Sequence, residues 1–182
     1  AERLALAVKQ KTISYHDPEK FDRNAFLGLH RLVKTLYPQV HDKLDLETVN
    51  DLSLLYTWEG QDPDLKPIML ISHLDVVPAD ESEGGGWEYP PFSGEIADGY
   101  VWGRGTLDIK SGVVGILEAV EYLLKQDFQP ERTIYLGFGH DEEVGGQNGA
   151  AAAGRRAGGR ARRTPSAARG ASAAGGSWGA CP

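Results

Sequence analysis

The sequence of 182 residues predicts an α/β fold from the order of its apolar segments. Two short apolar runs, 68–71 and 133–138, lie between turn residues and are typical of buried strands. Between them, apolar residues recur at helical spacing after Ser111, which predicts a helix. A strand, a loop, a helix and a second strand in this order are typical of a largely parallel sheet. We therefore expect the run 68–71 to be buried on both faces of the sheet.

The remaining elements follow from local signals. Residues 4–8 are compatible with a short helix that ends near Lys11. Asp22 is a suitable N-cap for a second helix, whose apolar stripe ends before Pro38. Alternating residues and turn signals predict two hairpins. One pairs residues 44–50 with 53–58, and the other pairs 95–97 with 100–102.

Length and charge limit the classes of protein that the sequence fits. The chain suits one domain, or one domain with an added tail. All 26 acidic residues precede residue 150, together with 13 of the 19 basic ones, so this part carries a formal charge of −13. Such acidity argues against nucleic acid as a partner of the main body. It is compatible with a protein that binds cations.

Two further observations bear on disulfides and membranes. Cys181 is the single cysteine, so no disulfide within the chain is expected and the redox compartment cannot be inferred. No apolar run approaches the roughly 20 residues that a bilayer span needs. We predict no membrane span in this chain, and its localisation stays open.

The run 68–71 leads into a histidine and a carboxylate that are two positions apart. Residues i and i+2 of a strand point to the same side, so His73 and Asp75 can face one cleft. A carboxylate there can bind one imidazole nitrogen and leave the other nitrogen free for a metal ion. The alternative is that both polar side chains simply meet solvent at a strand end.

Carboxylates from two other segments extend this pattern. Asp108 follows a glycine-rich loop, and Glu142 and Glu143 follow the strand 133–138. A hydrolase with two divalent ions needs a bridging carboxylate, terminal ligands and a general base. Asp108 suits the bridge, and of the two glutamates one can bind metal while the other acts as base. Zinc is the default for such mixed donors, and Co²⁺ or Mn²⁺ would fit.

Each carboxylate also has a simpler interpretation. Asp108 precedes a predicted helix and could act as a carboxylate at the helix N-terminus. Glu142 and Glu143 could be the solvated end of a strand. The joint placement of the three segments favours the metal site over these alternatives.

Residues 54–149 resemble the acetylornithine deacetylase/aminoacylase/carboxypeptidase S superfamily of co-catalytic zinc peptidases. Within it, they are most similar to carboxypeptidase S (Gly-X carboxypeptidase) and secreted N-acyl-amino-acid hydrolases. The resemblance is carried by long motifs in the family's order. They are SHLDVVP at 72–78, WEYPPFSG at 87–94, GRGTLDIKSG at 103–112 and GHDEEVGG at 139–146.

The resemblance implies a role for each site residue. His73 would bind one zinc ion and Asp75 would orient it, Asp108 would bridge two zinc ions, and Glu143 would bind the second. Glu142 would accept the proton in catalysis. The peptide bond after Asp108 would be cis.

The implied fold is a zinc-peptidase-like sheet with helices on both faces. The implied reaction is hydrolysis of an amide bond next to a free carboxylate, as in a carboxypeptidase acting on a peptide. An aminoacylase acting on an N-acyl amino acid and a non-catalytic metal-binding module are the alternatives. The full-length family member could form a homodimer.

The chain departs from the family after Glu143, where no Asp, Glu or His follows. Two further terminal ligands and the inserted dimerisation domain of the family are missing, so the catalytic domain would be incomplete and could be inactive. We assign residues 1–150 to its N-terminal part. Residues 151–182 read as a disordered Ala/Gly/Arg tail of low complexity. A frameshift would explain the tail, and a basic segment that binds an acidic partner is the alternative.

Overall fold

The computed structural model describes residues 1–161 and confirms the α/β fold. Its main sheet has the strand order β1-β2-β6-β3. Strands β3 and β6 are parallel, whereas β1 and β2 join the sheet in antiparallel pairs. The strands are β1 (Asp45–Val49), β2 (Ser53–Trp58), β3 (Ile68–His73) and β6 (Ile134–Gly139).

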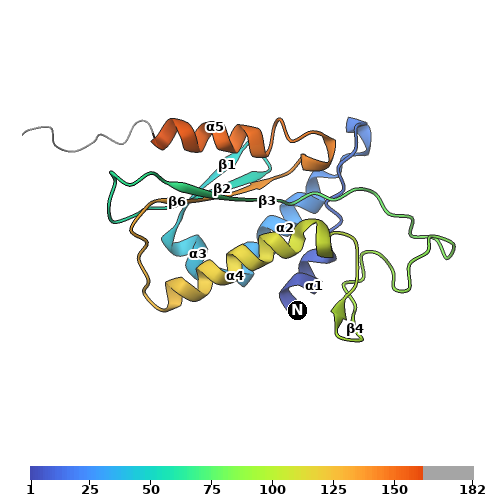
Figure 1. Cartoon of the computed structure of the whole chain (residues 1–182). Helices are drawn as coiled ribbons and strands as arrows, with labels where there is room; N and C mark the ends of the chain where they lie inside the picture. Colours follow the sequence, from blue (N-terminus) through green and yellow to red (C-terminus); the bar gives the residue numbers. More distant parts are fainter. Residues whose placement is uncertain (162–182) are drawn as a thin grey trace, which may run out of the picture.

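Helices lie on both faces of the sheet, as expected (Figure 1). Helix α5 covers one face, and the other four helices lie on the opposite side. The helices are α1 (Glu2–Val8), α2 (Arg23–Leu36), α3 (Pro38–Lys43), α4 (Ser111–Lys125) and α5 (Ala150–Ala161). Strands β4 (Ile96–Ala97) and β5 (Tyr100–Val101) form a separate small hairpin, as predicted.

Local signals account for the start and the end of α2. The Asp22 carboxylate accepts a hydrogen bond from the Asn24 amide at 2.9 Å, which is the predicted N-cap. The helix ends at Leu36, and Pro38 then occupies the first turn of α3. Proline is favoured at that position because its missing N–H would have no helical partner there. Helix α3 was not predicted from the sequence.

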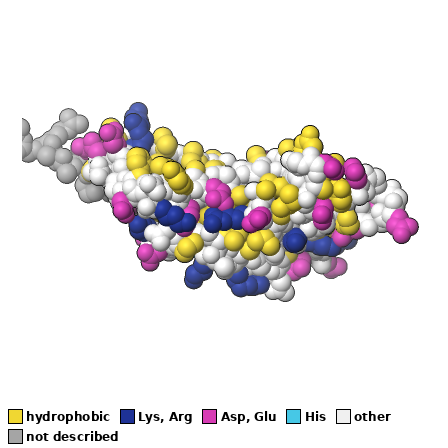
Figure 2. Space-filling model, turned by 90° about the horizontal axis from the view of Figure 1, so that it is seen from below, with side chains coloured by type: hydrophobic (Ala, Val, Ile, Leu, Met, Phe, Trp, Pro, Cys, Tyr) yellow, Lys and Arg dark blue, Asp and Glu magenta, His cyan; other side chains and the backbone are white. Residues whose placement is uncertain are grey.

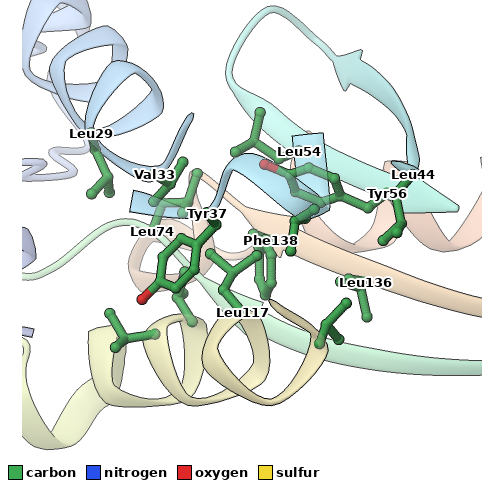
Figure 3. Close-up of a cluster of buried hydrophobic side chains, with 14 of the residues drawn as sticks. Leu29, Val33, Tyr37, Leu44, Leu54, Tyr56, Leu74, Leu117, Leu136 and Phe138 are labelled. Carbon is green, nitrogen blue, oxygen red and sulfur yellow. The ribbon is translucent and has the colours of Figure 1, made fainter. Parts of the chain in front are cut away.

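The larger hydrophobic core lies between the sheet and helices α2, α3 and α4 (Figure 3). The rings of Tyr37, Tyr56 and Phe138 are fully buried, and Leu117 of α4 packs with them. Alternate residues of β2 and β6 point to this face, as the period of two in a strand requires. This core fixes the sheet on which the polar residues described below are carried.

Strand β3 corrects one prediction from the sequence. Its apolar run was expected to be buried on both faces, but Ile68, Leu70 and Ile71 are 43%, 39% and 57% exposed. Among the described residues, β3 pairs only with β6 and forms an edge of the sheet. An apolar run looks the same in a central and an edge strand, because only the pairing partners differ.

Helix α5 corrects a second prediction, because residues 151–161 are helical rather than structureless. Ala152 and Ala157 pack against Val49, Leu55 and Tyr135 of the sheet. The small alanine side chains let the helix approach the sheet closely, although they produce no conspicuous apolar period. The rest of the predicted tail, with Cys181, lies outside the described residues.

The surface on the side of α1 and α4 carries apolar side chains among acidic and basic ones (Figure 2). Within residues 1–161, none of the helices combines the length and the apolar character needed to cross a bilayer.

Candidate metal centre

The fold brings together the three segments that carry the predicted site residues. His73 is the last residue of β3, and Glu142 and Glu143 lie in the turn η3 (Glu142–Val144) just after β6. Because β3 and β6 are parallel, both strands end at the same edge of the sheet. Asp108 reaches this edge from the turn η2 (Thr106–Lys110), which leads into α4.

Three of these side chains form a group with the dimensions of a metal site. His73, Asp108 and Glu143 each offer a ligand atom, and these atoms lie within 4.8 Å of one another. His73 Nε2 lies 3.1 Å from Asp108 Oδ1 and 3.7 Å from Glu142 Oε2. One imidazole and two carboxylates are donors that suit Zn²⁺, Co²⁺ or Mn²⁺. The residues present therefore fit a divalent ion.

Asp75 contacts His73 and the backbone of both glutamates. Its side chain is fully buried, and its Oδ1 lies 3.3 Å from His73 Nδ1. The main-chain carbonyl of Asp75 also lies 3.0 Å from the same nitrogen. The two carboxylate oxygens accept hydrogen bonds from the amides of Glu142 and Glu143 at 3.2 and 3.1 Å. Asp75 thus holds the imidazole and the backbone of both glutamates.

The electrostatics of His73 and Asp75 follow from this contact. Burial alone would lower the pKa of His73, but hydrogen bonds and the charge of Asp75, with a hydrogen bond to Asp108, raise the pKa to about 9. Burial would raise the pKa of Asp75, yet hydrogen bonds from His73 and from the Glu143 amide leave the pKa below its usual value. Asp75 therefore stays ionised and favours a proton on Nδ1 of the imidazole.

The pKa of Glu143 is raised, whereas that of Asp75 is lowered. Burial and the neighbouring charge of Asp108 raise the pKa of Glu143 above its usual value. Like charges that crowd together in a partly buried site are stabilised by a cation. The electrostatics are therefore those expected of a cation-binding group.

The loop before Asp108 needs glycine for close contact. Gly105 has φ +87°, and a Cβ atom there would lie 2.6 Å from Cγ1 of Val76. Only glycine allows the loop to pass so close to the chain that follows β3. The Asp108–Ile109 peptide bond is cis, as the family resemblance predicted. The N-cap residue of α4 is Lys110, not Asp108, and the Asp108 side chain is 76% exposed, so a ligand can reach it.

Two buried charged residues near the site were missed from the sequence. Asp141 is 8% exposed and accepts hydrogen bonds from the amides of Asn148 and Gly149 at 2.8 and 2.7 Å. Lys110 is 1% exposed, and its Nζ donates to the carbonyl of Gln10 at 2.5 Å. Burial lowers the pKa of Lys110 to about 7, against the opposing effect of Asp75. Both lie inside the recognised motifs, but spacing alone does not show that they are buried.

A cavity of about 580 Å³ lies away from this site. It is lined by residues that precede β3, such as Glu59 and Lys66, and by Arg160 of α5. None of the five predicted site residues lines it, so the candidate chemistry belongs to the open edge where β3 and β6 end.

Comparison with known proteins identifies a family. The model of the peptidase family M20/M25/M40 matches residues 69–178. The sequence is 51% identical over 152 residues to probable carboxypeptidase S-like 2 of Dictyostelium discoideum, covering 82% of this chain and 29% of that protein. It is 44% identical to carboxypeptidase S of Saccharomyces cerevisiae, covering 84% of this chain and 27% of that protein.

A third relative is described as an N-fatty-acyl-amino acid synthase/hydrolase of Danio rerio. It is 42% identical over 151 residues, which is 82% of this chain and 29% of that protein. The chain therefore spans less than a third of the length of these curated relatives.

Solved structures share the fold. Human carnosine dipeptidase 1 superposes with a TM-score of 0.64 at 22% identity, covering 81% of this chain and 32% of that one. A metallo-carboxypeptidase of the M20 family from Sulfolobus solfataricus gives a TM-score of 0.59 at 22% identity, covering 79% of this chain and 31% of that one. At this identity, the likeness concerns the fold.

Proposed function

The chain belongs to the peptidase family M20/M25/M40, and from this premise we propose that residues 1–150 are the N-terminal part of the catalytic domain of a metal-dependent hydrolase. The reaction is hydrolysis of an amide bond next to a free carboxylate, as in a carboxypeptidase that releases a C-terminal amino acid. The observation that carries the proposal is the convergence of His73, Asp108 and Glu143 within 4.8 Å.

Each residue has a proposed role that its contacts support. His73 and Glu143 would be terminal metal ligands, and Asp108, whose Oδ1 lies 3.1 Å from His73 Nε2, would be the bridging ligand if two ions bind. Glu142 lies 3.7 Å from His73 and is 54% exposed, so it can take a proton from water and pass it to the leaving amine. Asp75 keeps the His73 ring in the orientation in which Nε2 faces Asp108 and would be available to a metal ion.

The imidazole and carboxylate donors of this site favour Zn²⁺ among the divalent ions. Such an ion would polarise the substrate carbonyl and lower the pKa of a bound water molecule. The sequence offers three such donors here, and no Asp, Glu or His follows Glu143. If two ions bind, Asp108 and one other of these three donors would hold each of them, whereas a catalytic zinc usually has three protein ligands. Metal stoichiometry therefore separates a competent site, with two tightly bound ions, from a degenerate module with one weak ion or none.

A second substrate class is supported by the relatives. The similarity to an N-fatty-acyl-amino acid synthase/hydrolase favours an N-acyl amino acid as the alternative substrate. Both classes place an amide bond beside a free carboxylate, so the same residues serve either reaction. The ratio of kcat/KM for N-blocked dipeptides to that for N-acyl amino acids decides between them.

The test is hydrolysis of N-blocked dipeptides by the chain with and without a chelator, beside Glu142→Ala and Glu143→Ala. We expect the chelator to abolish activity and added Zn²⁺ to restore it. Glu142→Ala should lower kcat by about 10²- to 10⁴-fold with metal content unchanged, because it removes the base and no ligand. Glu143→Ala should lower metal content as well.

A dipeptide with an amidated C-terminus is the matched control, and it should not be cleaved at a comparable rate. Hydrolysis that survives both the chelator and Glu142→Ala would exclude the proposed mechanism. Wild-type chain that binds metal but cleaves neither substrate class would support the degenerate module instead.

A further inference from the structure

The segment Gln10–Ser14, between α1 and η1 (Pro18–Lys20), is hydrogen-bonded to all three segments that carry the proposed site residues. The first contact is with the segment of Asp108. Lys110, two residues further on, donates from Nζ to the carbonyl of Gln10 at 2.5 Å and is almost completely buried. A buried amino group keeps such a bond because losing it would leave a buried polar group without a partner.

The second contact is with the chain on either side of Asp75. Thr12 donates from Oγ1 to the carbonyl of Leu74 at 2.6 Å. The Val76 amide donates to the carbonyl of Thr12, and the Ser14 amide donates to the carbonyl of Val76, both at 3.0 Å. This short parallel pairing holds the residues before and after Asp75 to the N-terminal segment.

The third contact is with the segment of the two glutamates. Ser14 donates from Oγ to the carbonyl of His140 at 3.1 Å, two residues before Glu142. Thr12 and Ser14 are only 0% and 4% exposed. Leaving a buried hydroxyl without its partner is unfavourable, so these bonds constrain the backbone that they reach.

We infer that Gln10–Ser14 is a clasp that positions the three site segments relative to one another. The inference rests on the proposed metal site. The ligands come from segments far apart in the sequence, and a ligand set binds metal well only when its supporting contacts hold it in place. Thr12 and Ser14 are therefore positioning residues, outside the part of the chain that the family model matches.

Metal binding by the full chain tests the clasp, with Co²⁺ as the probe and Thr12→Val as the main variant. Valine has the shape of threonine without its hydroxyl. We expect the Kd for Co²⁺ to rise about 10-fold and the visible absorption of the bound ion to change. Thr12→Ser, which restores the hydroxyl, should return both towards wild type.

Thr57→Val is the matched control, because Thr57 is 2% exposed on β2 and its hydroxyl binds Arg160 instead of a site segment. This variant should keep the wild-type Kd and spectrum even if its Tm falls. If Thr12→Val lowers only the Tm and leaves the Kd and spectrum of Co²⁺ unchanged, the segment has a merely structural role and the inference is overturned.

Amide hydrogen exchange of the metal-free chain separates the clasp from the proposed function. Thr12→Val should accelerate exchange in 72–76, 105–110 and 139–143 together, and Thr57→Val should not. An increase confined to 74–76 would overturn the inference. Wild-type chain that binds no Co²⁺ would refute the proposed function, and the exchange pattern would then decide the clasp by itself.

Discussion

The two faces of the main sheet are covered by very different helices (Figure 1). On one face, α2, α3 and α4 bury large side chains such as Phe26, Leu117 and Leu124. On the other face, α5 buries only alanines, Ala152, Ala153 and Ala157. Apolar burial contributes roughly 25 cal/mol per Å², so the first face provides most of the stabilisation.

The face of the sheet that α5 covers depends on polar contacts instead. Asp141 binds the amides before α5, and Glu47 of β1 forms ion pairs with Arg156 and Arg160 at 3.5 and 2.7 Å. Exposed ion pairs contribute little, about 0–1 kcal/mol, so the buried Asp141 is the stronger tie. Asp141 also precedes Glu142 directly. The attachment of α5 and the placement of the glutamates thus share one residue.

The largest expected effect comes from breaking the well-packed face. Leu117→Ala removes a fully buried side chain from α4, and we expect the free energy of unfolding to fall by about 2–5 kcal/mol. Ala153→Gly on α5 is the counterpart and should cost about 1 kcal/mol, from helix propensity and one methyl group. Urea denaturation measures both. Equal losses would mean that the two faces contribute alike.

An intermediate effect is expected from Asp141, which links the start of α5 to the segment of the two glutamates. Asp141→Ala leaves the Asn148 and Gly149 amides without their acceptor, which should cost about 1–3 kcal/mol. Amide exchange should accelerate in α5 but not in α4. Asp141→Asn keeps one acceptor oxygen, so its loss of stability should lie between those of wild type and Asp141→Ala. Unchanged exchange in α5 would show that its alanines suffice to hold it.

The smallest expected effect is a pH dependence of stability that arises from three histidines packed on the face of α2, α3 and α4. Burial, the largest cause, lowers the pKa of His30, His41 and His140, which lie near Leu52, Tyr56 and Phe26 respectively. Their unfolded forms bind protons more readily, near pH 6.5. Stability should therefore fall as the pH drops below about 6.5.

Urea midpoints at pH 6.5 and 5.0 check this dependence, and His30→Gln should reduce the difference between them. This pH range avoids the titration of His73. Because the pKa of His73 is raised, its effect on stability changes with pH in the opposite direction. The contribution of His73 is complete below pH 6.5 and is lost as the pH rises towards about 9. A difference that His30→Gln leaves unaltered would contradict the role of His30.

Much of the fold could be predicted because its signals are local. The Asp22 cap, the apolar stripe of α4 and the Asp98–Gly99 turn each depend on neighbours within a few residues. The exposure of β3 could not be predicted, because it depends on which strands pair with it. Helix α5 was missed because alanine carries almost no apolar signal, although it packs well under a close helix.

The main-sheet strands, helices α1, α2 and α4, and the side chains available for a metal site could all be predicted from the sequence. The positions of His73, Asp108 and the two glutamates, after predicted strands and a glycine-rich loop, marked them as candidates, and the family resemblance implied that Glu143 is the ligand. Only the tertiary structure decided that the amides of both glutamates meet Asp75 and that Thr12 and Ser14 hold the neighbouring segments. Such contacts join residues more than 60 positions apart, and no local pattern encodes that distance.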